Sequence, residues 1–64
     1  MLTGKETQDF AAALIEQYGD VTLAAAIKNA RSAAARGELV AMLEWERVTR
    51  EALRQMPAEI MYLA

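Results

Sequence analysis

Gly19-Asp20 and Gly37-Glu38 are two glycine–acid pairs that divide the 64-residue chain into segments of 18, 16 and 26 residues. Glycine is the usual residue just past a helix end, where the backbone turns left-handed. Aspartate is a preferred N-cap, and an acid suits the positive end of the next helix dipole. Each pair therefore predicts that one helix ends and another begins.

The three segments all favour helix. The first opens with Thr3-Gly4-Lys5-Glu6, which has the S/T-x-x-E pattern of a capping box. Seven residues of the second are alanine, the strongest helix former. Pro57 disfavours helical geometry at the residue before it and could start a short helix of its own. We expect an all-α single domain over residues 1–64: a three-helix up-down bundle with helices at about 5–18, 21–36 and 38–55, and a short C-terminal helix.

Apolar side chains recur at helical spacing and mark the faces that we expect to be buried. The expected stripes are Phe10, Leu14 and Tyr18; then Leu23, Ile27, Ala30 and Ala34, flanked by Ala26 and Ala33; then Ala41, Trp45, Val48 and Ala52. The small side chains of the second stripe allow close approach of a neighbouring helix. We therefore expect the second helix to be the central one.

The chain is short for a stable monomer. Below roughly 70–80 residues a single core rarely supplies more than about 3–5 kcal/mol, so small proteins usually need an additional constraint. The sequence contains no cysteine and no histidine, which rules out disulfides and disfavours a zinc site. Oligomerisation remains, and we expect a homodimer or a complex with another helical protein.

The third helix should begin with an apolar run, residues 39–43, that has no polar face. Such a helix start is buried on several sides, which a small monomer cannot easily arrange. The tail after Pro57 is also more apolar than a free terminus should be. We expect the interface at Leu39, Val40, Met42, Leu43, Trp45, Ile60 and Leu63, although Trp45 would suit a core equally well.

The composition argues against several functional classes. The formal net charge is −2 with both signs mixed, which disfavours a dominant nucleic-acid surface. No secretory signal opens the chain, and no apolar run approaches the ~20 residues of a membrane span. We expect a cytoplasmic protein without a membrane segment.

The chain lacks the usual catalytic groups. Without histidine and cysteine, the common general bases and thiol nucleophiles are missing. Glu44 and Glu46 stand two apart on a helix and point in different directions. Asp20 at a helix start is better explained as a cap than as a metal ligand. We expect no enzyme and no catalytic, cofactor, metal or small-molecule substrate site.

Lys28, Arg31 and Arg36 form a candidate anion or partner patch on the second helix, which has no acid between residues 21 and 36. This patch supports an alternative function, a nucleic-acid-associated transcriptional regulator. The ordinary alternative is a solvated face with cations toward the helix C-terminus. A helix-turn-helix around Gly37 fits poorly, since Glu38 would stand at the start of the recognition helix.

The third helix carries three pairs of opposite charge at helical spacing. They are Glu46/Arg50, Arg47/Glu51 and Glu51/Arg54. Such surface pairs contribute about 0.2–0.5 kcal/mol each. We interpret them as the solvated face of the helix.

The stretch from Ala13 to Asp20, the alanine-rich helix, Arg36-Gly37-Glu38 and then Trp45 together resemble a group of very short alphaproteobacterial proteins. The resemblance covers roughly residues 11–54. The chain departs from the group at Glu38, where aspartate is more usual. The group is functionally uncharacterised, so the resemblance implies three helices and adds no activity. We expect a small, non-catalytic helical interaction or regulatory module that forms a homodimer.

Overall fold

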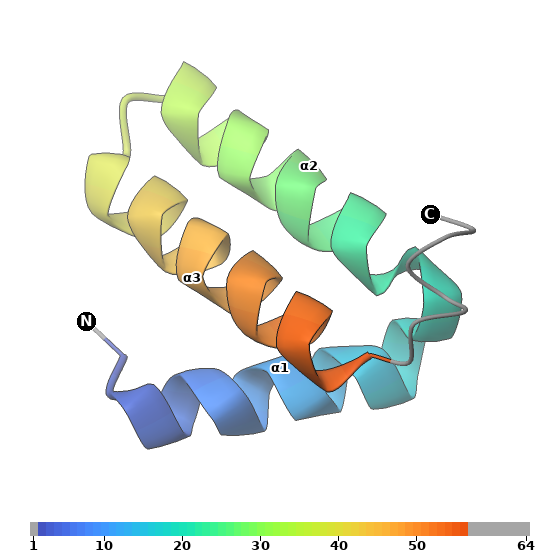
Figure 1. Cartoon of the computed structure of the whole chain (residues 1–64). Coiled ribbons are helices and arrows are strands. Elements are labelled where there is room, and N and C mark those ends of the chain that lie inside the picture. Colours follow the sequence, from blue (N-terminus) through green and yellow to red (C-terminus); the bar gives the residue numbers. More distant parts are fainter. Residues whose placement is uncertain (1, 57–64) are drawn as a thin grey trace.

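The computed structural model of the protein describes residues 2–56, and over that range the chain is helical with no strand. The elements are α1 (Gly4–Tyr18), a 3₁₀ turn η1 (Gly19–Val21), α2 (Thr22–Ala35) and α3 (Leu39–Gln55) (Figure 1). The all-α prediction is confirmed, and each α-helix begins and ends within one residue of its expected bounds. The helix expected after Pro57 and the interface residues Ile60 and Leu63 lie outside the described residues.

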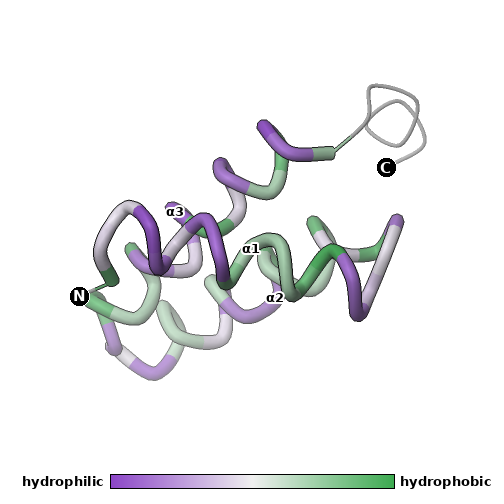
Figure 2. Tube along the Cα trace, turned by 90° about the horizontal axis from the view of Figure 1, so that it is seen from below, coloured by the Kyte–Doolittle hydropathy of each residue, from purple (hydrophilic) through white to green (hydrophobic). Residues whose placement is uncertain are grey.

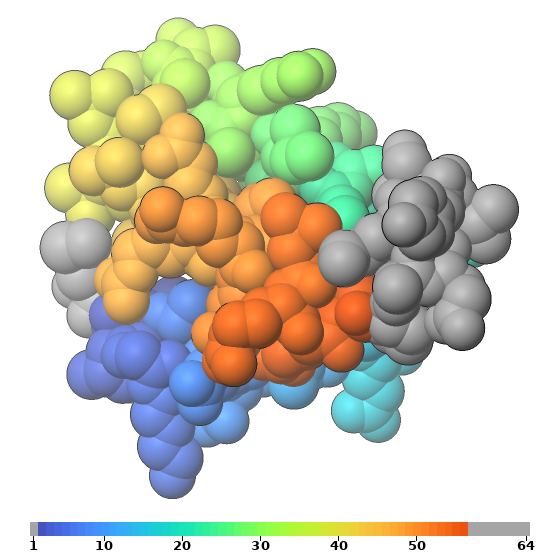
Figure 3. Space-filling model, in the orientation of Figure 1, coloured from blue at the N-terminus to red at the C-terminus, as the bar shows by residue number. Residues whose placement is uncertain are grey.

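α2 and α3 form an antiparallel hairpin and lie side by side along their lengths, and α1 runs obliquely below them (Figure 1). α3 packs against both other helices, whereas α1 and α2 have little contact with each other. In the space-filling view α3 separates α1 from α2 on the face shown (Figure 3). The expectation that the second helix is central was wrong: α3 is the helix that the other two share.

The capping box at the start of α1 is confirmed. The Glu6 backbone N–H donates to Thr3 Oγ1 at 3.1 Å, and the Thr3 N–H donates to Glu6 Oε1 at 2.9 Å. The end of α2 is also as predicted, with Gly37 at φ +74°. The N–H of the next residue donates to Ala33 O at 2.9 Å and that of Gly37 to Ala34 O at 3.0 Å, which is a Schellman motif.

Asp20 does not cap α2, and this prediction was wrong. Asp20 lies within η1, and the N-cap position belongs to Val21, which makes no side-chain cap bond. The connection is held by Thr22 instead, whose hydroxyl donates to Gly19 O at 2.7 Å and Leu14 O at 3.2 Å. The turn continues for one 3₁₀ turn before α2 begins, which displaces the acid from the capping position.

The core is built largely from small side chains. Its buried cluster consists of Ala11, Leu23, Val48, Ala52 and Met56. The largest fully buried side chains are Val48 and Thr22. Both Val48 and Ala52 belong to the stripe predicted for the third helix. Polar and apolar positions alternate along each helix, as expected where one face packs on a neighbour (Figure 2).

The predicted buried faces of α1 and α2 are confirmed only in part: on α2, Leu23, Ala26 and Ala33 are buried as predicted. Large residues of the predicted stripes are exposed, namely Phe10, Tyr18 and Ile27. On α1 the buried positions carry smaller side chains instead, Thr7 and Ala11. Small side chains let helix axes approach closely. Where the axes are close, larger apolar side chains do not fit between the helices and lie outside the contact.

Candidate functional site

The first two turns of α3 present large apolar side chains to solvent. Leu39 is 62 % exposed, Val40 59 % and Leu43 46 %. Met42 is half-buried. We call Leu39, Val40 and Leu43 the apolar surface. These residues were predicted as interface residues, and in a single chain nothing within residues 2–56 covers them.

Trp45, also predicted for the interface, takes part in packing within the chain. It is half-buried against the core, and its ring meets that of Phe10 edge to face with centroids 5.6 Å apart. A hollow of about 210 Å³ lies beside the two rings and is lined by Leu2, Phe10, Ala41, Glu44, Trp45 and Val48. The Leu2 N–H donates to Glu44 Oε1 at 2.9 Å. Trp45 therefore joins α3 to α1 rather than lying in the apolar surface.

The basic patch predicted on the second helix is only partly assembled. Lys28 and Arg31 are exposed on α2 and line a shallow hollow with Ile27. Arg36 lies just past the helix, and its Nε donates to Glu38 Oε1 at 2.7 Å. This ion pair directs Arg36 toward the turn, so two cations rather than three share the α2 face.

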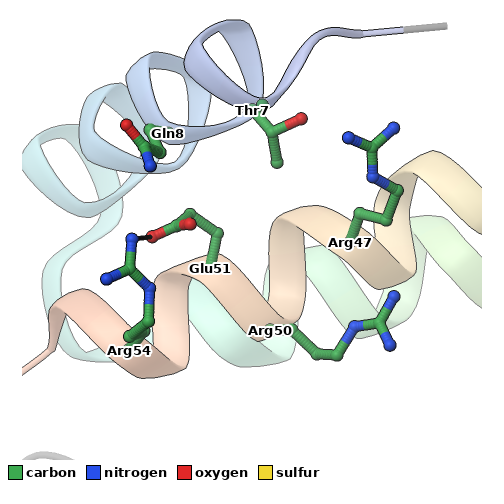
Figure 4. A pocket seen from close by; sticks show the side chains of 7 residues that line it. Thr7, Gln8, Arg47, Arg50, Glu51 and Arg54 are labelled. Carbon is green, nitrogen blue, oxygen red and sulfur yellow. Dashed lines mark hydrogen bonds and ion pairs between the residues drawn. The ribbon is translucent and has the colours of Figure 1, made fainter.

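A groove of about 280 Å³ between α1 and α3 gathers arginines that sequence analysis assigned only to surface ion pairs. We call it the arginine groove. It is lined by Gly4, Thr7 and Gln8 from α1 and by Arg47, Arg50, Glu51 and Arg54 from α3 (Figure 4). The three arginines stand at i, i+3 and i+7 and are therefore neighbours on the surface of α3, although the Arg50 side chain extends away from α1 (Figure 4).

Hydrogen bonds fix several of the side chains that line the arginine groove. Arg47 Nη1 donates to Leu2 O at 3.0 Å, and Arg54 Nη2 donates to Glu51 Oε2 at 2.6 Å. At one end, the Gln55 side-chain amide donates to the Gln8 carbonyl at 3.1 Å and ties α3 to α1. Arg47 and Arg54 are thereby held in defined positions beside the groove.

Of the three ion pairs predicted on α3, residues 2–56 contain one, Glu51–Arg54. The Glu46/Arg50 and Arg47/Glu51 pairs are not formed. Arg47 bonds to the chain segment before α1 instead, and Arg50 has no carboxylate within 4 Å in the described part of the chain. The helical spacing of the arginines was the signal for the groove, but only the packing of α1 on α3 turns that spacing into a concave surface.

Two further structural findings concern metals and membranes. No group of three or more His, Cys, Asp or Glu residues is placed to hold a metal ion among the described residues. Within the same residues, every helix is too short or too polar to cross a bilayer.

Comparison of the chain with protein-family models, with curated proteins and with solved structures finds no match. The resemblance to short alphaproteobacterial proteins therefore stays a prediction. The candidate sites rest on the geometry of this chain alone.

Proposed function

We propose that the protein is a non-catalytic helical interaction module that works as a homodimer of three-helix up-down units joined through the apolar surface. One observation carries the proposal. Leu39 and Val40, at the start of α3, are each more than half exposed, whereas the core has Val48 among its largest fully buried side chains. The chain thus exposes larger apolar groups than most of those it fully buries.

The energetics favour a second copy of the chain as the occupant of the apolar surface. Burying a Leu or Val side chain contributes roughly 1.5–3 kcal/mol. An isologous two-fold interface would bury Leu39, Val40 and Leu43 from both copies at once. Because each of these side chains is already about half-buried, the gain is roughly 2–5 kcal/mol per copy, which is comparable to what a core of this size supplies. Dimerisation would therefore provide the stabilisation that neither disulfides nor a structural zinc can supply here.

The charges at the edge of the apolar surface are compatible with self-association. Arg36 and Glu38 form an exposed ion pair in the turn that leads into α3. The pair presents one charge of each sign, so two copies related by a two-fold axis would meet without an excess of like charge. Exposed charges of this kind contribute little to affinity but disfavour wrong registers.

Sedimentation equilibrium over a range of concentrations tests the proposal. The wild-type protein should be a dimer at low micromolar concentration, and Leu43→Asp should shift it toward monomer. Val21→Asp is the matched control, because Val21 is 52 % exposed but lies in η1, outside the apolar surface. A wild-type chain that stays folded and monomeric at that concentration would refute the proposal, as would equal effects of the two substitutions.

A nucleic-acid-associated regulator remains the second candidate. Lys28 and Arg31 support it, because both are exposed on α2. It has less support than the dimer, since Arg36 is engaged by Glu38. Salt-titrated binding to duplex DNA tests it: specific use of α2 requires that Lys28→Glu and Arg31→Glu each weaken binding.

A further inference from the structure

The arginine groove concentrates positive charge in a chain whose formal net charge is −2. Three arginines line it, and Glu51 is the one carboxylate among its lining residues. Three positive charges and one negative charge leave a local sum of +2. The Glu51 side chain is only 14 % exposed and already accepts from Arg54 and from the Gln55 amide. An anion in the groove would therefore meet guanidinium groups before it met Glu51.

The arginines are spread along the groove rather than gathered at one point. Arg47 and Arg54 are seven residues apart, which corresponds to about 10 Å along the helix axis. Arg47 and Arg54 turn toward the side of α3 that faces α1, whereas Arg50 extends along the outer side (Figure 4). One compact anion cannot contact all three guanidinium groups, because Arg47 and Arg54 are so far apart and Arg50 diverges from Arg47 to the other side of α3 (Figure 4). An extended segment with several negative groups can.

The guanidinium groups have donors to spare. Arg47 uses Nη1 for the Leu2 carbonyl, and Arg50 has no carboxylate within 4 Å among residues 2–56. A guanidinium carries five N–H donors in a planar fork that matches the two oxygens of a carboxylate. The arginine groove can therefore engage new carboxylates without first breaking the Glu51–Arg54 pair.

We propose that the arginine groove binds a short acidic peptide segment of a partner protein, with carboxylates of that segment paired to Arg47 and Arg50. The inference rests on the proposed function and names the partner that the dimer would recruit. The apolar surface occupies the start of α3 and the arginine groove its second half, so both can be occupied together. A local charge of +2 over ~10 Å is small for a nucleic-acid backbone, which spreads contacts over many phosphates.

Fluorescence anisotropy with a labelled glutamate hexapeptide tests the inference, with a glutamine hexapeptide as the neutral probe. The wild-type protein should bind the glutamate peptide, more weakly as salt is raised, and should not bind the glutamine peptide. Arg50→Glu should weaken binding about fivefold. Arg31→Glu, which changes the net charge equally but lies on α2, should leave the affinity within about twofold.

Three outcomes would overturn the inference: equal binding of the two peptides, equal losses in the two variants, or displacement by single-stranded DNA at a lower concentration than the unlabelled glutamate peptide needs. Arg50 is exposed, so circular dichroism should show an unchanged fold for Arg50→Glu. Sedimentation of the same variant separates the two proposals. If Arg50→Glu loses peptide binding but remains a dimer, the loss is due to the arginine groove. If the wild type is a monomer and still binds the peptide, only the dimer proposal is refuted.

Discussion

Phe10 on α1 and Trp45 on α3 meet edge to face, with ring centroids 5.6 Å apart and 71° between the ring planes. The contact joins two helices that are separated by the whole of α2 in the sequence. Phe10 remains exposed on its other side, so the ring pair is at the rim of the core rather than in its centre. The pair is one of the few places where large side chains contribute to the packing of α1.

Replacing Phe10 with leucine should lower the free energy of unfolding by about 1 kcal/mol, since aromatic pairs contribute ~0.5–1.5 kcal/mol beyond their buried area. Urea unfolding followed by far-UV circular dichroism, at one fixed protein concentration, measures the change. A double-mutant cycle with Trp45→Leu should give a coupling energy of the same size. Tyr18→Leu is the control, because Tyr18 is similarly exposed on α1 and its ring meets no other in the described residues; an equal loss there would contradict the prediction.

Thr22→Val should destabilise the protein by about 1–2 kcal/mol, because the Thr22 hydroxyl is fully buried and donates to Gly19 O and Leu14 O. Valine keeps the shape but leaves those carbonyls with one partner fewer. Thermal or urea unfolding gives the difference. Thr49→Val is the matched control: its hydroxyl also donates to a helical carbonyl, Trp45 O, but Thr49 is only half-buried, so water can replace the lost bond. The prediction fails if the two substitutions cost the same.

Gly37→Ala should cost about 1–2 kcal/mol, since the backbone at Gly37 has φ +74° and a Cβ is strained there. No atom lies within 4 Å of the position that the new Cβ would take, so the cost is conformational rather than steric. Gly4→Ala, in the first turn of α1 and also in open space, should instead be neutral or stabilise by about 0.5 kcal/mol. Chemical unfolding should therefore show a lower free energy of unfolding for Gly37→Ala and an unchanged or higher one for Gly4→Ala.

The pKa of Glu6 is lowered from its ordinary value of 4.5, first by the hydrogen bond from the Thr3 backbone N–H and then by the Thr3 side chain. A lowered folded-state pKa stabilises the fold above the unfolded-state value and loses that contribution as the pH falls through the folded-state value. Unfolding free energy should therefore fall more in the wild type than in Glu6→Gln as the pH is lowered from 4.5. Parallel pH profiles for the two proteins would refute a role for this carboxylate.

The helices and most of their ends were predictable because the signals are local. The Thr3/Glu6 capping box and the Gly37 turn each depend on residues within a few positions, and both were confirmed. Asp20 was misassigned because a side chain caps only if the turn places it at the first helical N–H groups. The extra 3₁₀ turn at Gly19–Val21 prevents this, and Thr22 makes the connecting hydrogen bonds instead.

The faces of the helices were less predictable than their ends. Hydrophobicity favoured Phe10 and Ile27 as core residues, but the structure leaves both exposed and buries the smaller Ala11 on α1. Side-chain apolarity indicates which residues gain from burial. The distance between helix axes decides which of them fit, and that distance depends on the partner helix. The predicted Arg47/Glu51 ion pair is absent for a similar reason. Arg47 donates to Leu2 O instead, and the packing of α1 beside α3 is what places that carbonyl within reach.

The sequence by itself determined an all-helical chain and the positions of its helices. These follow from propensity and capping, which act within a segment. Only the tertiary structure decided that α3 is the shared helix, and that Arg47, Arg50 and Arg54 line a groove beside α1. Both depend on the angle at which α1 crosses α3, which is set by close packing between residues distant in sequence.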